Sequence, residues 1–439
     1  MPAASAAAFR KLFGTDGVRG VAGEFLSAEL ALGLARAATT RVQGGEPARV
    51  LVIRDTRESG EMLEAAVAAG IAAAGGDALL AGVLPTPGAP LLIGRYGFDL
   101  AAVLSASHNP YQDNGIKFFG GDGFKLSDAV ELEIEGMLEA PQPSRRIGRV
   151  RRLHGAREDY LRALHERFKD LDLTGRRILL DCANGATFEA APEIFRRLGA
   201  HVDVMAASPD GRNINAGCGS THIEPLRTAM AEGRHDAGFA FDGDGDRLLA
   251  VDRTATVVDG DELIALAAKH LGVRGVAVTV MTNYGFHAAM RAAGIEVATT
   301  PVGDRYVLEA LRERDWRLGG EQSGHIIDMG FVPSGDGIAS ALLALEALEG
   351  RDLRDRHAMD KLPQTLVNVR VRDRDALESA TAVHRAVERE GAALEGRGRV
   401  LLRPSGTEPL VRVMVEAPTA EEAESVCSRL VALVEAELT

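Results

Sequence analysis

Two serines and a histidine lie at the end of an apolar run in the stretch VLSASHNPYQDNGIKFF, residues 103–119. The run predicts a buried strand, so Ser105 and Ser107 would lie where a strand gives way to a loop, a common place for functional groups. The Asp-Asn-Gly segment at 113–115 is typical of a turn, and residues 116–119 would form a return strand. Because a serine at a strand end is often only a turn or cap residue, this stretch leaves open which hydroxyl, if either, does chemistry.

The stretch GFAFDGDGDRLLAVD places Asp242, Asp244 and Asp246 directly after an apolar strand. Carboxylates so close together repel one another, and a bound cation would relieve that repulsion; oxygen-only ligands suit Mg²⁺ or Ca²⁺. A further oxygen from the protein or the substrate would help to complete the shell. The spacing is not that of an EF-hand, since Arg247 takes the place of its glycine. A solvated acidic turn and an aspartyl-phosphate site of the DxD type remain as other interpretations.

The stretch RPSGTEPLVR suits a phosphate. It offers Arg403, the hydroxyls of Ser405 and Thr407 on either side of Gly406, and Arg412 on the following strand. A turn that presents backbone N–H groups and hydroxyls beside a guanidinium can bind such an anion. A Pro-Ser-Gly turn with surface arginines is the alternative interpretation.

Two glycine-rich stretches carry further polar groups. GGEQSGH places the carboxylate of Glu321, the hydroxyl of Ser323 and the imidazole of His325 on one loop. Such a trio suits a polyhydroxyl ligand, although an ordinary polar loop has the same composition. FGTDGVRG is another glycine-rich loop, and it carries Arg19 near its end.

Strand-like and helix-like segments alternate along the chain and must position these groups. Strand-like runs at 48–55, 176–185 and 275–283 are each followed by a helical pattern and a second strand. This alternation predicts three similar α/β units whose mixed or mainly parallel sheets carry helices on both faces. After about residue 363 the strands are less apolar, which predicts a smaller α+β domain. The predicted domains are residues 1–155, 156–255, 256–364 and 365–439.

Composition and charge narrow the class of protein. A chain of 439 residues with 46% hydrophobic and 26% charged residues is typical of a soluble globular protein of several domains. A net charge of −13 argues against nucleic acid or anionic membranes as main partners. Cys182, Cys218 and Cys427 are spaced for neither a disulfide framework nor a zinc site, which indicates a reducing compartment. With no signal-peptide layout and no membrane-length apolar run, we expect a cytoplasmic protein.

The motifs SASHNP, DGDGDR, GEQSGH and RPSGTEP occur in this order, and together they resemble the α-D-phosphohexomutase superfamily over nearly the whole chain. The resemblance implies three α/β domains and a smaller C-terminal domain, with the active site in the central cleft where all four meet. It also implies that Ser107 is carried as a phosphoserine. Its phosphoryl group would pass to a sugar phosphate, and the other phosphoryl group of the resulting bisphosphate would return to Ser107.

The same resemblance implies a role for each motif. The three aspartates and the phosphate on Ser107 would hold one Mg²⁺ per active site. Lys117 and His325 are the candidates for the base and the acid, and Arg19 would help to neutralise the transferred group. We expect His108 to shape the loop rather than to react. The residues implied to bind the substrate are Arg247, Glu321, Ser323, Arg403, Ser405, Gly406, Thr407 and Arg412.

Within the superfamily, PDGRNINAGCGSTH, LFGTDGVRG and TPVGDRYV are similar to the phosphoglucosamine mutase branch. That branch implies interconversion of glucosamine 6-phosphate and glucosamine 1-phosphate on the bacterial route to UDP-N-acetylglucosamine, with a sugar bisphosphate as activator. A monomer or a homodimer is expected. The alternatives are the phosphomannomutase/phosphoglucomutase branch and a non-catalytic sugar-phosphate-binding protein. The second would be expected to lack Ser107 or one of the aspartates, and all are present.

Overall fold

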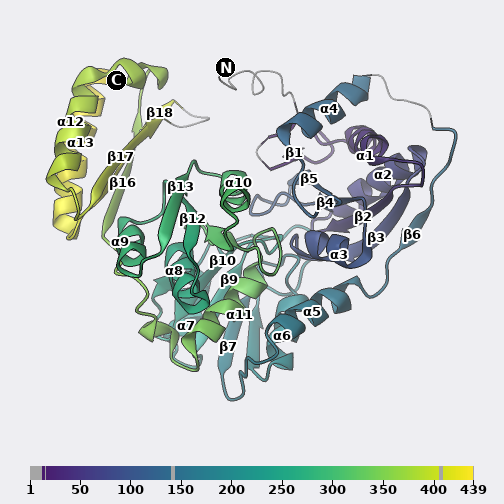
Figure 1. The fold of residues 1–439 in the computed structure, drawn as a ribbon, viewed down its shortest axis with the longest axis horizontal. Coiled ribbons are helices and arrows are strands. Elements are labelled where there is room, and N and C mark those ends of the chain that lie inside the picture. The colour runs from purple at the N-terminus through teal and green to yellow at the C-terminus, as the bar shows by residue number, and fades with distance from the viewer. Residues whose placement is uncertain (1–11, 15, 140–143, 405–408, 439) are drawn as a thin grey trace. The chain divides into compact units, whose positions relative to one another are not determined.

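The computed structural model describes residues 12–14, 16–139, 144–404 and 409–438 (Figure 1). The chain divides into two compact units, Met1–Val280 with Ala298–Arg356, and Met281–Val297 with His357–Thr439. Over the described residues the strands form three sheets that contain parallel pairs, followed by a smaller antiparallel sheet. The predicted fold class, three α/β sheets and a smaller C-terminal α+β part, is confirmed.

The first sheet has the strand order β1-β5-β4-β2-β3-β6. Its strands β2, β3 and β4 are parallel, and β5 returns antiparallel to β4. Val50 and Val52 on β2 pack in one core with side chains of α1 and α2; a strand covered in this way reads as a continuous apolar run. The elements are β1 Val18–Val21, α1 Ala28–Val42, β2 Arg49–Arg54, α2 Gly60–Ala73, β3 Asp77–Val83, α3 Gly88–Tyr96, β4 Leu100–Leu104, β5 Asp113–Gly120, α4 Asp128–Glu139 and β6 Val150–Arg152.

The second sheet has the order β11-β10-β9-β7-β8. Its strand β7 is parallel to both β8 and β9, and β9 turns back into the antiparallel strand β10. The DGDGDR motif is the connection in this hairpin. The elements are α5 Ala156–Arg167, β7 Arg177–Asp181, α6 Ala190–Arg197, β8 His201–Met205, α7 Glu224–Ala231, β9 Ala237–Phe241, β10 Leu248–Asp252 and β11 Val257–Val258.

The third sheet has the order β13-β12-β14-β15. Strand β14 is parallel to β12 and antiparallel to β15, so that the GEQSGH motif connects β14 to β15. The elements are α8 Gly260–Leu271, β12 Gly275–Thr279, β13 Glu296–Thr300, α10 Asp304–Arg314, β14 Leu318–Gly320, β15 Ile326–Asp328, α11 Gly337–Leu348 and a 3₁₀ helix at Leu353–Asp355.

The second unit is built on an antiparallel sheet of order β16-β18-β17. The two helices α12 and α13 lie on one face of this sheet (Figure 1) and share its apolar core. Asn283 and the backbone of Tyr284 bond to the buried carboxylate of Glu416, which joins α9 to the sheet. The elements are α9 Tyr284–Ala292, β16 Gln364–Arg370, a 3₁₀ helix at Asp375–Ser379, α12 Thr381–Ala393, β17 Arg399–Pro404, β18 Leu410–Glu416 and α13 Ala420–Leu438.

The turn predicted at 113–115 is wrong, because β5 already includes these residues. Strand β1 is the physical reason: it runs antiparallel to the start of β5 and pairs Arg19 with Gly115, so these backbones have ladder partners. Only a glycine fits at this position, since a Cβ on Gly115 would lie 2.5 Å from the carbonyl oxygen of Ser105. Arg19, expected in a glycine-rich loop, therefore lies on a strand.

Candidate active site

The two serines after β4 have different surroundings. Ser105 is fully buried; its hydroxyl donates to Oδ2 of Asp55 at 2.6 Å and accepts the backbone N–H of Ser107 at 2.9 Å. Ser107 has a left-handed backbone, with φ of 51°, and its hydroxyl donates to Oδ2 of Asp242 at 2.5 Å. Strained conformations of this kind cluster at functional sites. Ser105 therefore supports the loop, and Ser107 presents its hydroxyl to the acidic loop.

The three aspartates converge as the sequence predicted. Their carboxylate oxygens lie within 4.8 Å of one another, and all three side chains are buried. Burial, followed by the charges of Asp246 and Asp244, raises the pKa of Asp242 well above its usual value. Oδ1 of Asp244 and Oδ1 of Asp246 are buried without a hydrogen-bond partner in the described part of the chain. An oxygen set with buried, unused acceptors fits a divalent cation.

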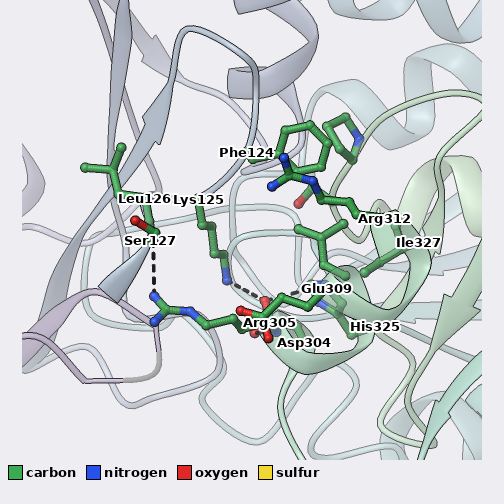
Figure 2. A pocket seen from close by; sticks show the side chains of 13 residues that line it. Phe124, Lys125, Leu126, Ser127, Asp304, Arg305, Glu309, Arg312, His325 and Ile327 are labelled. Atoms are coloured by element: carbon green, nitrogen blue, oxygen red, sulfur yellow. Dashed lines mark hydrogen bonds and ion pairs between the residues drawn. The ribbon is translucent and has the colours of Figure 1, made fainter. Parts of the chain in front are cut away.

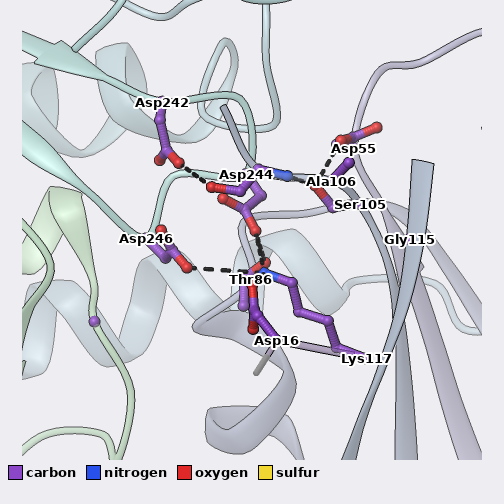
Figure 3. Close-up of polar contacts among 12 residues, drawn as sticks. Asp16, Asp55, Thr86, Ser105, Ala106, Gly115, Lys117, Asp242, Asp244 and Asp246 are labelled. Atoms are coloured by element: carbon purple, nitrogen blue, oxygen red, sulfur yellow. Dashed lines mark hydrogen bonds and ion pairs between the residues drawn. The ribbon is translucent and has the colours of Figure 1, made fainter. Parts of the chain in front are cut away.

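Lys117 on β5 points into the acidic cluster (Figure 3). Its Nζ lies 2.8 Å from Oδ2 of Asp244, 3.0 Å from Oδ2 of Asp16 and 3.9 Å from Oδ2 of Asp246. Burial would lower the pKa of Lys117, but these three carboxylates outweigh it and raise the pKa. In this arrangement Lys117 is therefore an ammonium group, able to donate a proton or to neutralise charge.

A chain of opposite charges continues from this lysine. Asp16 also pairs with Lys125, which in turn pairs with Asp304. Burial would raise the pKa of Asp16, yet Lys117, Lys125 and Arg19 hold it well below its usual value. Sequence reasoning missed Asp16, Lys125 and Asp304. A signal was present in the sequence, since Asp16 lies in the glycine-rich stretch FGTDGVRG and Asp304 lies in TPVGDRYV. Of these two stretches, only Arg19 was predicted to belong to the site.

His325 lies at the far end of this chain. Its Nδ1 is 3.6 Å from Oδ2 of Asp246 and its Nε2 is 3.7 Å from Oδ2 of Asp304. Burial would lower the pKa of His325, but Asp246 and then Asp304 raise it. The backbone N–H of Gly335 donates to Nε2 at 3.1 Å, a bond that only the neutral ring can accept. Both charge states of the ring thus have a stabilising contact, as a proton-transfer group requires.

Two arginines contact the neighbours of Ser107. Arg19 approaches the carbonyl oxygen of Ala106 and pairs with Asp16. Arg247 donates its backbone N–H to Asp242 at 3.1 Å, and its Nη1 lies 3.3 Å from Nδ1 of His108. Burial and then Arg247 and Arg19 lower the pKa of His108, which favours the neutral ring. The arrangement suits an anion bound beside the hydroxyl.

Glu321 and Ser323 follow β14. Oε1 of the buried Glu321 accepts the backbone N–H of Gly303 at 3.0 Å, whereas Ser323 is exposed. Gly324 packs against β10: a Cβ there would lie 1.8 Å from the carbonyl oxygen of Leu248. This packing joins the predicted sugar-binding loop to the strand that follows the loop of the three aspartates.

A pocket opens beside His325 (Figure 2). Lys125, Asp304 and His325 line one side of it. On another side the guanidinium carbon of Arg312 lies 4.1 Å from the centroid of the Phe124 ring. The Lys125–Asp304 end of the charge chain therefore faces a space that is open to a small molecule.

Arg403 and Arg412 lie in the second unit. They are directly opposite each other on β17 and β18. Burial and then the charge of Arg412 lower the pKa of Arg403, so a bound anion would stabilise both guanidinium groups. The predicted ligands Ser405, Gly406 and Thr407 lie outside the described residues.

No helix among the residues that the structure describes is long and apolar enough to cross a membrane.

Four family models match the chain, described as phosphoglucomutase/phosphomannomutase α/β/α domains I, II and III and the C-terminal domain. They cover residues 10–145, 158–256, 259–368 and 366–433.

Relatives and solved structures are similar over nearly the full length. Phosphoglucosamine mutase of Deinococcus deserti is 48% identical over 97% of this chain and 98% of its own. That of Mycobacterium tuberculosis is 49% identical over the same shares. A phosphoglucomutase/phosphomannomutase family protein of Burkholderia thailandensis superposes with a TM-score of 0.83 at 22% identity, covering 96% and 97% of the two chains. N-acetylphosphoglucosamine mutase of Aspergillus fumigatus, in complex with GlcNAc-6P and magnesium, gives 0.70 at 17% identity over 99% and 98%.

Proposed function

The chain belongs to the phosphoglucomutase/phosphomannomutase family, and on this premise we propose that it is a phosphoglucosamine mutase. It is an isomerase that interconverts glucosamine 6-phosphate and glucosamine 1-phosphate. We assign the substrate from the 48–49% identity, over 97% of the chain, to proteins of that name. The hydroxyl of Ser107, bonded to a buried triple-aspartate cluster, supports the reaction class.

Ser107 is the phosphoryl carrier. In the active form its Oγ bears a phosphoryl group, which moves to the C1 hydroxyl of glucosamine 6-phosphate as the bond from phosphorus to Oγ breaks. The hydroxyl proton leaves to a base, and a 1,6-bisphosphate forms. The intermediate then reorients in the site, so that its other end faces Ser107. Its 6-phosphoryl group passes to Ser107, and glucosamine 1-phosphate is released. A sugar bisphosphate activates the enzyme by loading Ser107.

Asp242, Asp244 and Asp246, with a phosphate on Ser107, would hold one metal ion, which we propose to be Mg²⁺. Oδ1 of Asp244 and Oδ1 of Asp246, buried and without a partner among the described residues, support this assignment, as does the magnesium present with the Aspergillus enzyme. When bound, the ion supplies positive charge against the transferred phosphoryl group. Arg19 and Lys117 add further positive charge on the protein side.

Lys117 and His325 move the protons. Lys117 carries a proton because Asp16 and Asp244 stabilise its ammonium form, and we assign it as the acid that protonates a leaving oxygen. His325 has contacts that stabilise either charge state, as described above, and it suits the group that accepts a proton. By microscopic reversibility, the two residues exchange these tasks when the reaction runs from glucosamine 1-phosphate to glucosamine 6-phosphate.

The remaining predicted residues bind the substrate. Glu321 and Ser323 bind sugar hydroxyls, and Arg247 binds beside the reacting phosphate. Arg403 and Arg412 form a fork for the phosphate that does not react. The hydroxyls and backbone of the Ser405–Thr407 loop complete that phosphate site.

We also propose the four domain ranges given above and a cytoplasmic location. The three cysteines Cys182, Cys218 and Cys427 are free and buried. Free thiols are the usual state in a reducing compartment.

A coupled assay with three substrates tests the proposal. The purified enzyme is activated with glucose 1,6-bisphosphate and given glucosamine, glucose or mannose 6-phosphate in parallel, and formation of each 1-phosphate is measured. We expect kcat/KM to be highest for glucosamine 6-phosphate. A higher value for glucose or mannose 6-phosphate would assign the enzyme to the other branch. No turnover of any of the three would contradict a mutase.

A further inference from the structure

Side chains from two distant parts of the sequence hold the loop after β4. The buried Arg57 donates from Nη2 to the carbonyl oxygens of Ser107 at 2.8 Å and Asn109 at 2.9 Å. Asn215, from the loop between β8 and α7, donates from Nδ2 to the same two oxygens, at 2.9 Å and 3.2 Å. A carbonyl oxygen has two lone pairs, so each of these oxygens is fully used.

Ser107 depends on such contacts because of its backbone. A non-glycine residue in the left-handed region is strained, and it persists only where the surrounding structure over-determines it. The strained backbone torsions of Ser107 set the direction of its carbonyl group. The donors that bind this carbonyl therefore hold the backbone of Ser107, and with it the direction of Oγ. Loss of a donor would let the peptide relax and turn the hydroxyl away from Asp242.

Asn215 is placed to hold the metal-binding loop as well. A Cβ on Gly243 would lie 2.6 Å from the carbonyl oxygen of Ser107 and 2.7 Å from Nδ2 of Asn215, so these three groups meet in one close contact. The backbone of Asn215 is itself left-handed, with φ of 57°, and its N–H donates to the carbonyl oxygen of Ala183 at 2.9 Å. Asn215 is only 5% exposed. One buried amide thus contacts both loops of the reaction centre.

We propose that Asn215 is a positioning residue for phosphoryl transfer. It touches neither the sugar nor the transferred group. It acts through the backbone of Ser107, holding Oγ in line with the three aspartates while the phosphoryl group is passed on. The inference rests on the proposed function, because the direction of Oγ affects turnover only if Ser107 carries the phosphoryl group.

The test replaces Asn215 by glycine, which removes the amide donor and keeps a left-handed backbone without strain. We expect kcat to fall at least about tenfold, with KM for glucosamine 6-phosphate unchanged within about twofold. Phosphoryl loading of Ser107 by glucose 1,6-bisphosphate, followed by intact mass, should slow in parallel. Asn184→Gly is the matched control: Asn184 is also left-handed, at φ of 48°, but its amide donates to Asn213 and not to the Ser107 loop. Its kcat should stay within about twofold.

The outcomes separate the inference from the proposed function. An inactive wild-type enzyme would contradict the mutase, whatever the variants do. An active wild type with unchanged kcat and loading rate in Asn215→Gly would overturn the inference, and so would an equal loss in Asn184→Gly. If Asn215→Gly does not fold, the isosteric Asn215→Asp replaces the donor by an oxygen that faces two carbonyls. The same selective loss of kcat would support the inference, and an unchanged kcat would overturn it.

Discussion

The hydroxyl of Ser107 donates to Oδ2 of Asp242 at 2.5 Å, and the two residues come from loops 135 positions apart in the chain. Burial and the charges of Asp246 and Asp244 raise the pKa of Asp242. A nearby cation or hydrogen bond would therefore stabilise its charged form. The bond holds the hydroxyl that we propose as the phosphoryl carrier against the loop of the three aspartates.

Replacing Asp244 by Asn should weaken metal binding. Oδ2 of Asp244 already bonds to Thr86 and Lys117, while its Oδ1 has no partner among the described residues and is available to a cation. The neutral amide removes a charge that the cation needs. We expect the Mg²⁺ concentration for half-maximal rate to rise at least about tenfold, measured by titrating the rate with Mg²⁺. The control is Asp203→Asn on β8, and an unchanged Mg²⁺ requirement in Asp244→Asn would remove this loop from the metal site.

Replacing Arg403 by Lys should impair both directions of the reaction. Lysine keeps the charge but not the planar fork that binds a phosphate through two N–H groups. Loss of one charge-assisted contact is worth about 1.5–3 kcal/mol, or roughly ten- to a hundred-fold in kcat/KM. Steady-state kinetics should show KM raised for both glucosamine 1-phosphate and glucosamine 6-phosphate. An increase for only one of them would mean that the two orientations do not share this phosphate site.

The carboxyl of Asp336 should make stability depend on pH. Burial raises its pKa from 3.8 to about 6, although it caps α11 and accepts the hydroxyl of Tyr160 at 3.0 Å. Because the folded state holds the proton more tightly than the unfolded state, protonation of Asp336 stabilises the fold. This stabilisation is fully present below pH 3.8 and is lost as pH rises through about 6. A shift of this size corresponds to about 3 kcal/mol. Asp336→Asn has no such titration, so its Tm relative to wild type should rise between pH 4.5 and 7. A constant difference would refute the shift.

The sequence predicted the fold class and the convergence of the three aspartates because both depend on local pattern. Apolar strands followed by Gly-rich loops are readable directly, and carboxylates separated by single glycines must face the same space. The sequence could not show that Lys117 and Lys125 share Asp16, because such pairs depend on how strands far apart in the chain are ordered. The turn expected at 113–115 failed for the same reason, since its partner strand β1 lies almost a hundred residues earlier. The residue pattern alone left Ser105 and Ser107 equivalent, and only the family resemblance favoured Ser107. The contacts that separate the two hydroxyls involve Asp55 and Asp242, which lie far from them in the sequence.

Intact mass spectrometry of wild type, Ser107→Ala and Ser105→Ala after exposure to glucose 1,6-bisphosphate tests the central claim most directly. Wild type and Ser105→Ala should gain the mass of one phosphoryl group, and Ser107→Ala should gain none and should not turn over glucosamine 6-phosphate. Ser105→Ala loses a supporting hydrogen bond, which is worth about 0.5–1.5 kcal/mol, and should remain active at a reduced rate. A phosphoryl adduct and turnover in Ser107→Ala, with neither in Ser105→Ala, would contradict the assignment of Ser107 as the carrier.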